Sequence, residues 1–175
     1  WMNRLRRNLA RVWQRLERRW ASRAQVRPAL PRSAEPVVRL PATHQAAIAR
    51  LVQPAVVQSA PYRDRVLSVP WYDADPDLIA FQRAFIAEMQ RRGLPFFAHT
   101  IWRDEVTQNR LYREGRTRAR FGQSAHNYGM AVDIVHFGRY WDLTEKEWAV
   151  IGLIGKEVAR KRNIKVTWGG DWSFY

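Results

Sequence analysis

The stretch Ser124-Ala-His-Asn-Tyr-Gly-Met-Ala-Val-Asp133 places a histidine and an aspartate on either side of a glycine. A loop that turns into a strand here can bring His126 and Asp133 together, and Gly129 keeps the turn free of a side chain or allows a positive φ. Imidazole and carboxylate are good zinc ligands. A structural histidine with its hydrogen bonds satisfied explains the same spacing, so the stretch by itself leaves both interpretations open.

The composition narrows the classes of protein without naming a partner. The chain has 175 residues, enough for one domain with its own core plus an appendage, and its net charge is +14. Nucleic acid, anionic lipid, phosphorylated envelope polymers and acidic proteins all attract such a charge. Cysteine is absent, which excludes disulfide scaffolds and thiolate metal sites. The visible sequence contains no secretory signal and no apolar stretch of membrane-spanning length.

Residues 1–23 predict a basic amphipathic helix. Apolar residues recur at spacings of three and four, and arginines occupy the other face. The apolar face consists of Trp1, Leu5, Leu9, Val12, Trp13, Leu16 and Trp20. We expect this helix to dock on another protein chain or on the domain, while insertion at an anionic membrane surface is the alternative. Nucleic acid is the weaker partner, because the charge is concentrated in one helix without a recognition motif.

Residues 24–42 contain four prolines and predict an extended linker, and residues 43–175 predict one domain. Helices and strands in this domain do not alternate regularly, so we expect an α+β fold around a small antiparallel sheet. The pattern predicts helices over Thr43–Val52, from Asp75 or Pro76 to Gly93, over Glu105–Glu114 and over Leu143–Arg162, and strands over Pro95–Trp102, Gly129–Val135 and Ile164–Trp168. Thr43 is the expected N-cap of the first helix, and Leu78, Phe81, Phe85 and Met89 are the expected buried stripe of the second.

Read as a whole, SAHNYGMAVD resembles the SxHxxGxAxD motif of the LAS zinc peptidases. This family includes bacterial D-Ala-D-Ala carboxypeptidases and phage L-alanyl-D-glutamate endolysins. Two further stretches agree in the same order: Ile101–Arg116 looks like the family's YRSxExQxxLYxxGR segment, and Trp168–Trp172 looks like its WGGDW. The resemblance covers roughly residues 76–175, and the WGGDW form favours the endolysin and cell-wall-hydrolase branch.

The resemblance implies a role for each matching position. His126 and Asp133 would be zinc ligands, and Ser124 would orient the site by hydrogen bonding. Arg103 matches the family arginine that stabilises the oxyanion or holds a substrate carboxylate. Gln108 matches a position close to the substrate, with a solvated helix glutamine as the alternative.

We expect the residues of the WGGDW stretch to have structural roles. Trp168 and Trp172 are expected to build core and cleft wall rather than to touch substrate. Asp171 is expected to accept a hydrogen bond behind the metal ligands or to belong to a turn.

The resemblance also exposes a departure from the family. Family members continue past WGGDW into an Asp-x-x-His segment that supplies the third zinc ligand and the general base, whereas this chain ends at Tyr175. His136 should point to the opposite face of its strand from Asp133, His99 is a poor stand-in, and His44 lies elsewhere. We therefore expect a peptidase-like domain cut short at its C-terminus, which by itself binds zinc weakly, with a natural pseudo-enzyme as the remaining alternative.

The leading hypothesis is zinc-dependent hydrolysis of peptide bonds in peptidoglycan stem peptides. The expected enzyme is an endolysin, a virion-associated enzyme or a cell-wall hydrolase that acts at the cell wall or periplasm. The alternative is an inactive structural or binding component of an assembly, docked through residues 1–23. The metal-site hypothesis requires the ligand atoms of His126 and Asp133 to lie within about 5 Å of each other. It also requires Arg103 at the same site.

Overall fold

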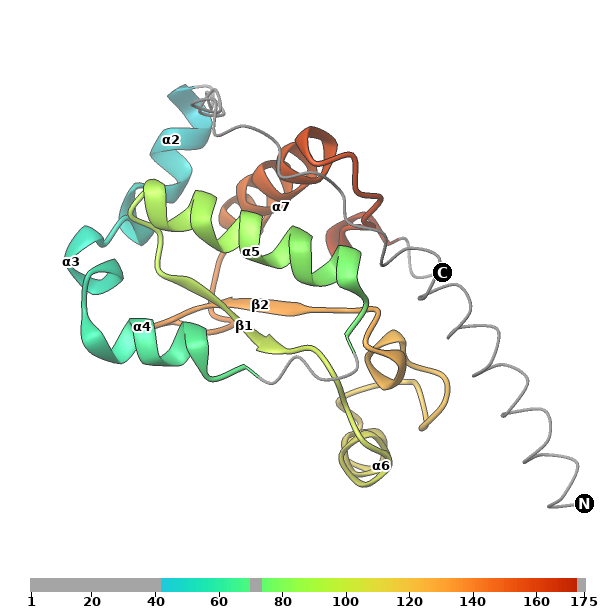
Figure 1. The fold of residues 1–175 in the computed structure, drawn as a ribbon. Coiled ribbons are helices and arrows are strands. Elements are labelled where there is room, and N and C mark those ends of the chain that lie inside the picture. Colours follow the sequence, from blue (N-terminus) through green and yellow to red (C-terminus); the bar gives the residue numbers. More distant parts are fainter. Residues whose placement is uncertain (1–41, 70–73, 173–175) are drawn as a thin grey trace, which may run out of the picture. The chain divides into compact units, whose positions relative to one another are not determined.

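A computed structural model of the protein describes residues 42–69 and 74–172 (Figure 1). The predicted helix over residues 1–23 lies outside the described residues, as does all of the linker except its last residue.

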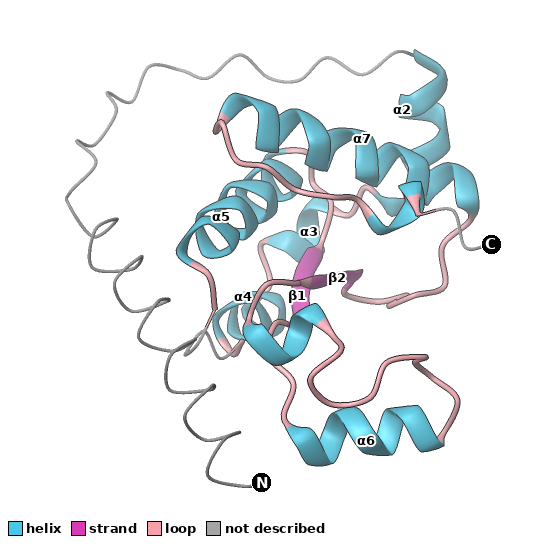
Figure 2. Ribbon diagram, turned by 90° about the vertical axis from the view of Figure 1, so that its right-hand side faces the viewer, coloured by secondary structure: helices cyan, strands magenta, loops and turns pink. Residues whose placement is uncertain are grey.

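The domain is rich in helices and has one small sheet (Figures 1 and 2). Its α-helices are α2 (Ala42–Ile48), α3 (Pro54–Val57), α4 (Ala60–Leu67), α5 (Pro76–Arg91), α6 (Glu105–Arg113) and α7 (Glu145–Lys161). The 3₁₀ helices are η1 (Ala49–Leu51), η2 (Ala125–Tyr128) and η3 (Gly169–Asp171), and the strands are β1 (Phe96–Thr100) and β2 (Asp133–His136). None of the helices in the described ranges is both long and apolar enough to cross a membrane.

Strands β1 and β2 pair antiparallel, which confirms the predicted α+β class. Phe96 lies opposite His136 and Ala98 lies opposite Ile134, but the next pair is Thr100 with Asp133. The register shift leaves His99 as an extra residue in β1, and such a bulge redirects the side chains beside it. The sheet therefore ends with Asp133 facing the last residue of β1.

The main core lies where α5, α7 and β1 pack together. It is formed by apolar side chains from all three elements, with α2 and η1 closing one end, and includes Ile48, Leu51, Phe81, Phe85, Met89, Phe96, Val150, Ile151, Ile154 and Val158. Helix α5 begins at Pro76, one of the two predicted starts, and Asp75 caps it by accepting hydrogen bonds from the backbone of Asp77 and Leu78. Leu78 itself is only partly buried and packs on a second cluster, which contains Val69, Ala74, Ala98 and Ile101.

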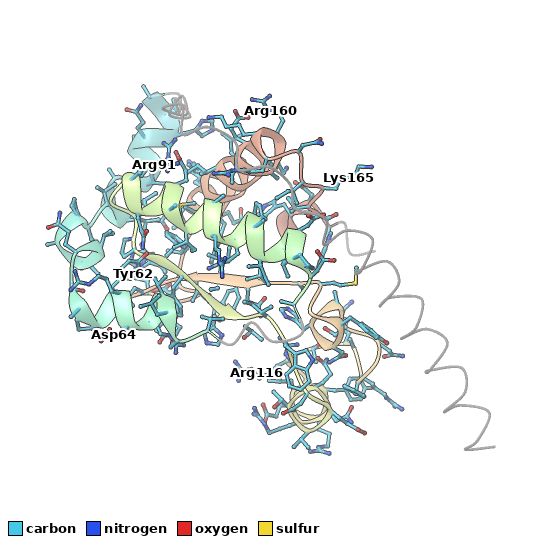
Figure 3. All side chains as sticks on the ribbon, viewed as in Figure 1. Tyr62, Asp64, Arg91, Arg116, Arg160 and Lys165 are labelled. Carbon is cyan, nitrogen blue, oxygen red and sulfur yellow. The ribbon has the colours of Figure 1, made fainter. Side chains whose placement is uncertain are left out.

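Buried polar groups tie the surrounding helices to this core. Tyr62 of α4 donates a hydrogen bond of 2.7 Å to the carbonyl oxygen of Phe96 in β1 (Figure 3). Burial raises the pKa of Tyr62 to about 12, so its hydroxyl remains a donor at any ordinary pH. The contact anchors α4 to the sheet.

Glu147 caps α7 from a buried position. Its carboxylate accepts hydrogen bonds from Thr144 N at 2.7 Å and Thr144 Oγ1 at 3.0 Å, and from Arg139 Nη1 at 3.0 Å. Burial alone would raise the pKa of Glu147, but these hydrogen bonds and the charge of Arg139 hold it below its ordinary value. The charged carboxylate joins the turn after β2 to the start of α7.

Three predictions about the secondary structure are wrong: one helix cap, one strand start and one whole strand. Thr43 lies inside α2, which begins at Ala42, so it is not the N-cap. The second strand begins at Asp133 rather than at Gly129, because residues 130–132 lie in the loop after η2 and do not pair with β1. Ile164–Trp168 is not a strand, although Ile164 and Val166 pack on the core, because alternating burial without a neighbouring strand edge makes no ladder.

Candidate active site

The turn that carries His126 is built by its own polar side chains. Ser124 caps η2 by accepting a hydrogen bond of 3.3 Å from the backbone of His126, and Asn127 accepts one of 3.3 Å from the backbone of Ser124. Gly129 ends η2 with φ 63°, in the left-handed region that glycine enters at little cost. The chain then turns toward β2, so the expected loop-to-strand turn is confirmed.

Three hydrogen bonds fasten this turn to residues 101–103, the segment that follows β1. The Asn127 side chain donates to the carbonyl of Arg103 at 2.8 Å, and the backbone of Arg103 donates to the carbonyl of His126 at 3.0 Å. The third joins His126 Nδ1 to the carbonyl oxygen of Ile101 at 3.1 Å. A carbonyl can only accept, so Nδ1 carries the proton and a neutral ring keeps its lone pair on Nε2. Backbone groups thus orient His126 as a metal ligand needs to be oriented.

His126 and Asp133 converge as predicted. His126 Nε2 lies 3.4 Å from Asp133 Oδ1, inside the limit set by the metal-site hypothesis. This distance is long for a hydrogen bond. With bonds of about 2.0–2.1 Å, two ligands of one tetrahedral zinc lie about 3.3 Å apart. The pair therefore fits two positions of a zinc site.

Arg103 lies at the same site, also as predicted. Its Nη2 is 3.4 Å from Asp133 Oδ2, and its Nη1 donates to Gln108 Oε1 at 3.1 Å. Gln108 is fully buried and donates a second hydrogen bond, of 2.7 Å, to the carbonyl of Ala119. The solvated-glutamine alternative is therefore wrong, and the visible contacts of Gln108 act on the site through Arg103.

Two other histidines, His99 and His136, lie in the two strands and have different surroundings. His99 is the bulge residue of β1, and its Nδ1 lies 2.8 Å from Thr100 Oγ1. Burial and the charge of Arg65 lower the pKa of His99, Asp133 opposes the shift, and Arg103 adds to it. His136 is buried on the other face of β2, where its Nδ1 accepts hydrogen bonds from two backbone amides. Across residues 42–69 and 74–172, no group of three His, Cys, Asp or Glu side chains is placed to hold a metal.

The WGGDW residues lie against α7. Trp168 covers Gly152 so closely that a Cβ built there would be 2.5 Å from the indole nitrogen. Asp171 forms an ion pair with Lys156 of α7 at 2.7 Å and not a contact with His126. Trp172 is mostly exposed, so the expectation that it builds core is wrong: the chain turns through η3 and leaves its ring outside.

Two contributors were missed from the sequence. Asn127 occupies a variable position of the motif, yet its side chain joins the turn to Arg103 in the segment after β1. A Ser-x-x-Asn capping pattern was present and could have indicated it. The carbonyl of Ile101 has no side-chain signal, since any residue could supply it.

Residues 117–175 match the sequence model of an M15 peptidase family, described as D-alanyl-D-alanine carboxypeptidase. This segment is therefore similar to the peptidase domains of that family. The chain is also 28% identical over 107 residues to the peptidoglycan L-alanyl-D-glutamate endopeptidase CwlK of Bacillus subtilis (strain 168), an alignment that covers 51% of this chain. The chain spans 60% of the length of that relative. These matches confirm the resemblance inferred from the three motifs.

A solved structure is also similar. The crystal structure of the Serratia marcescens L-Ala D-Glu endopeptidase ChiX superposes with a TM-score of 0.48 at 25% identity, over 65% of this chain and 78% of that one. Within this chain, the M15 match includes His126, Asp133 and Trp168–Trp172. Arg103 and Gln108 precede the matched segment and are joined to it by the hydrogen bonds described above.

Proposed function

We propose that this protein hydrolyses a peptide bond in the stem peptides of peptidoglycan with the help of zinc. The observation that carries the proposal is the 3.4 Å approach of His126 Nε2 to Asp133 Oδ1, with His126 Nδ1 held by a carbonyl. The M15 match and the activity of the Bacillus relative, a peptidoglycan endopeptidase, support peptidase chemistry on this substrate.

His126 and Asp133 would hold the metal. A bound zinc supplies a Lewis acid that activates water and polarises the scissile carbonyl. The described part of the chain offers these two residues only, whereas catalytic zinc takes three protein ligands. The family resemblance implies that an Asp-x-x-His segment supplies the third ligand and the general base.

Arg103 would stabilise the negative charge that develops on the carbonyl oxygen during attack. Fixed hydrogen-bond donors at such a position favour the transition state over the substrate. Gln108 keeps the guanidinium in place, because it is buried and hydrogen-bonded on both sides. A pre-positioned cation needs little reorganisation during the reaction.

The Bacillus relative is an L-alanyl-D-glutamate endopeptidase, so we propose that the bond after L-alanine of the stem peptide is the one cut. The setting we propose is a wall hydrolase or phage endolysin that acts at the cell wall or periplasm.

The test uses the chain as it stands and a version extended by an Asp-x-x-His segment. We expect calorimetry to show weak zinc binding by the first and tight binding by the second. The extended form should cut a synthetic stem peptide between L-Ala and D-Glu, and a chelator should abolish the cleavage. His126→Ala should remove both zinc binding and cleavage, whereas the matched control His44→Ala should keep both.

Zinc binding that survives in His126→Ala would refute the metal site. Loss of binding in His99→Ala would identify His99 as a third ligand instead. An extended chain that binds zinc but leaves the peptide intact would favour the inactive structural component over the enzyme.

A further inference from the structure

Two aromatic side chains stand out of the surface in the turn after β2. Tyr140 is 44% exposed and Trp141 is 53% exposed. Both are nevertheless held by ring contacts: Tyr140 lies edge-on to Phe97 at 5.8 Å between ring centroids, and Trp141 lies against Trp148 at 6.2 Å. We call Tyr140 and Trp141 the aromatic platform. Exposed rings that are fixed from behind lose little entropy when they bind a ligand.

The backbone of the platform is strained. Tyr140 has φ 52°, a left-handed conformation that a bulky residue rarely adopts. It is kept there by two backbone hydrogen bonds with His136, of 2.8 Å and 3.3 Å. Strain of this kind persists where the surrounding structure holds it, and it concentrates at functional sites.

The platform borders the candidate active site through His99. The His99 ring lies 6.0 Å from that of Tyr140 and 6.4 Å from that of Trp141. The next residue, Thr100, pairs across the sheet with Asp133. A ligand on the platform would therefore lie beside the proposed metal ligands.

The charge around the platform favours a neutral ligand. Residues 137–148 contain two basic and three acidic side chains, although the whole chain carries a net charge of +14. Arg139, the nearest cation in sequence, is engaged by Glu147. The segment that carries the platform therefore has no excess of positive charge of its own, although Arg65 lies nearby over the Phe97 ring.

We propose that the aromatic platform binds an acetamido sugar of the glycan strand to which the stem peptide is attached. The inference rests on the proposed function. In peptidoglycan, L-alanine is linked to the lactyl group of N-acetylmuramic acid, so a site that cuts after L-alanine lies one residue, or about 3.5 Å of extended chain, from a sugar derivative. The C–H face of a sugar ring carries partial positive charge and stacks on the negative face of an aromatic ring.

The test measures binding by the metal-free 175-residue chain, so it depends on neither zinc nor catalysis. Three ligands are compared by calorimetry: a synthetic stem peptide, the same peptide linked to the N-acetylglucosaminyl-N-acetylmuramic acid disaccharide, and the disaccharide alone. We expect the disaccharide to raise the affinity of the peptide about tenfold, and we expect Trp141→Ala to remove most of this gain. Phe121→Ala is the matched control, because Phe121 is a comparably exposed aromatic residue, 43%, in the segment after α6.

Equal affinity of the wild-type chain for the peptide with and without sugars would overturn the proposal. So would an undiminished gain in Trp141→Ala, provided that circular dichroism shows both proteins folded. If neither peptide binds, the disaccharide alone decides: its binding to the wild type but not to Trp141→Ala supports the platform. Self-association that Trp141→Ala abolishes, without sugar binding, would assign the surface to a second copy of the chain. Cleavage of the sugar-free peptide by the extended chain tests the proposed function separately.

Discussion

Replacing Glu147 with alanine should destabilise the domain by about 4 kcal/mol. Removing one partner of a buried ion pair costs about 3–5 kcal/mol, and the lower end applies because Arg139 remains partly open to solvent. Loss of the hydrogen bonds to Thr144 at the start of α7 adds about 1 kcal/mol. The sum is a large share of the roughly 5–15 kcal/mol that stabilises a domain.

Glu147→Gln tests the charge separately from the shape. It keeps the volume and one acceptor, so we expect a loss of about 2 kcal/mol. Because the pKa of Glu147 is lowered in the folded state, its charge stabilises the fold above the unfolded pKa of about 4.3, and this contribution is lost as pH falls through the folded value. The difference between wild type and Glu147→Gln should therefore shrink on acidification.

The assay is urea unfolding followed by circular dichroism, near neutral pH and again at about pH 4. Glu157→Gln is the control, because Glu157 pairs with the exposed Arg160 on the surface of the same helix and should contribute no more than about 0.5 kcal/mol. A Glu147→Ala variant within about 1 kcal/mol of wild type would refute the reasoning.

Three further predictions concern packing, the site and the N-terminal segment. Gly152→Ala should lower the free energy of unfolding by about 1–3 kcal/mol in thermal melts, because its Cβ would clash with Trp168. The control is Gly155→Ala in the same helix, whose Cβ meets only ordinary contacts. Its free energy of unfolding should stay unchanged or rise by up to about 1 kcal/mol. Gln108→Ala should lower kcat for stem-peptide cleavage by the extended chain about tenfold, with a smaller effect on KM, because the site arginine loses its support. Deleting residues 1–23 should leave the circular dichroism melt of the domain unchanged and should abolish any oligomer seen by light scattering; a full-length monomer that binds anionic liposomes would favour a membrane role instead.

The motif around His126 was sufficient to predict where the two candidate ligands meet, because a glycine between two polar ligands is a local signal. The helices were predicted for a similar reason: Asp75 and Gly93 mark the limits of α5 in the sequence itself. Contacts between distant segments carried no such signal. The hydrogen bond from Asn127 to Arg103, in the segment after β1, depends on how the turn docks, which a local pattern does not contain.

Ile164–Trp168 shows the limit of a periodic pattern. Its side chains do alternate between partly buried and exposed positions, as a strand would require. The pattern reports which face meets the core and not whether a neighbouring strand is present to pair with. The exposure of Trp172 was missed in the same way, since the direction of the chain after η3 depends on tertiary packing.

The hydrogen bonds that join Ile101 and Arg103 to His126 and Asn127 close a loop that contains all of α6. The entropic cost of closing a flexible loop grows only with the logarithm of its length, so doubling the loop would cost about 0.6 kcal/mol. The exposed stretch around Gly115 and Arg116 (Figure 3) is therefore a place where insertions should be tolerated while the two candidate ligands keep their positions. A new binding segment could therefore be grafted into this loop at little cost to the site.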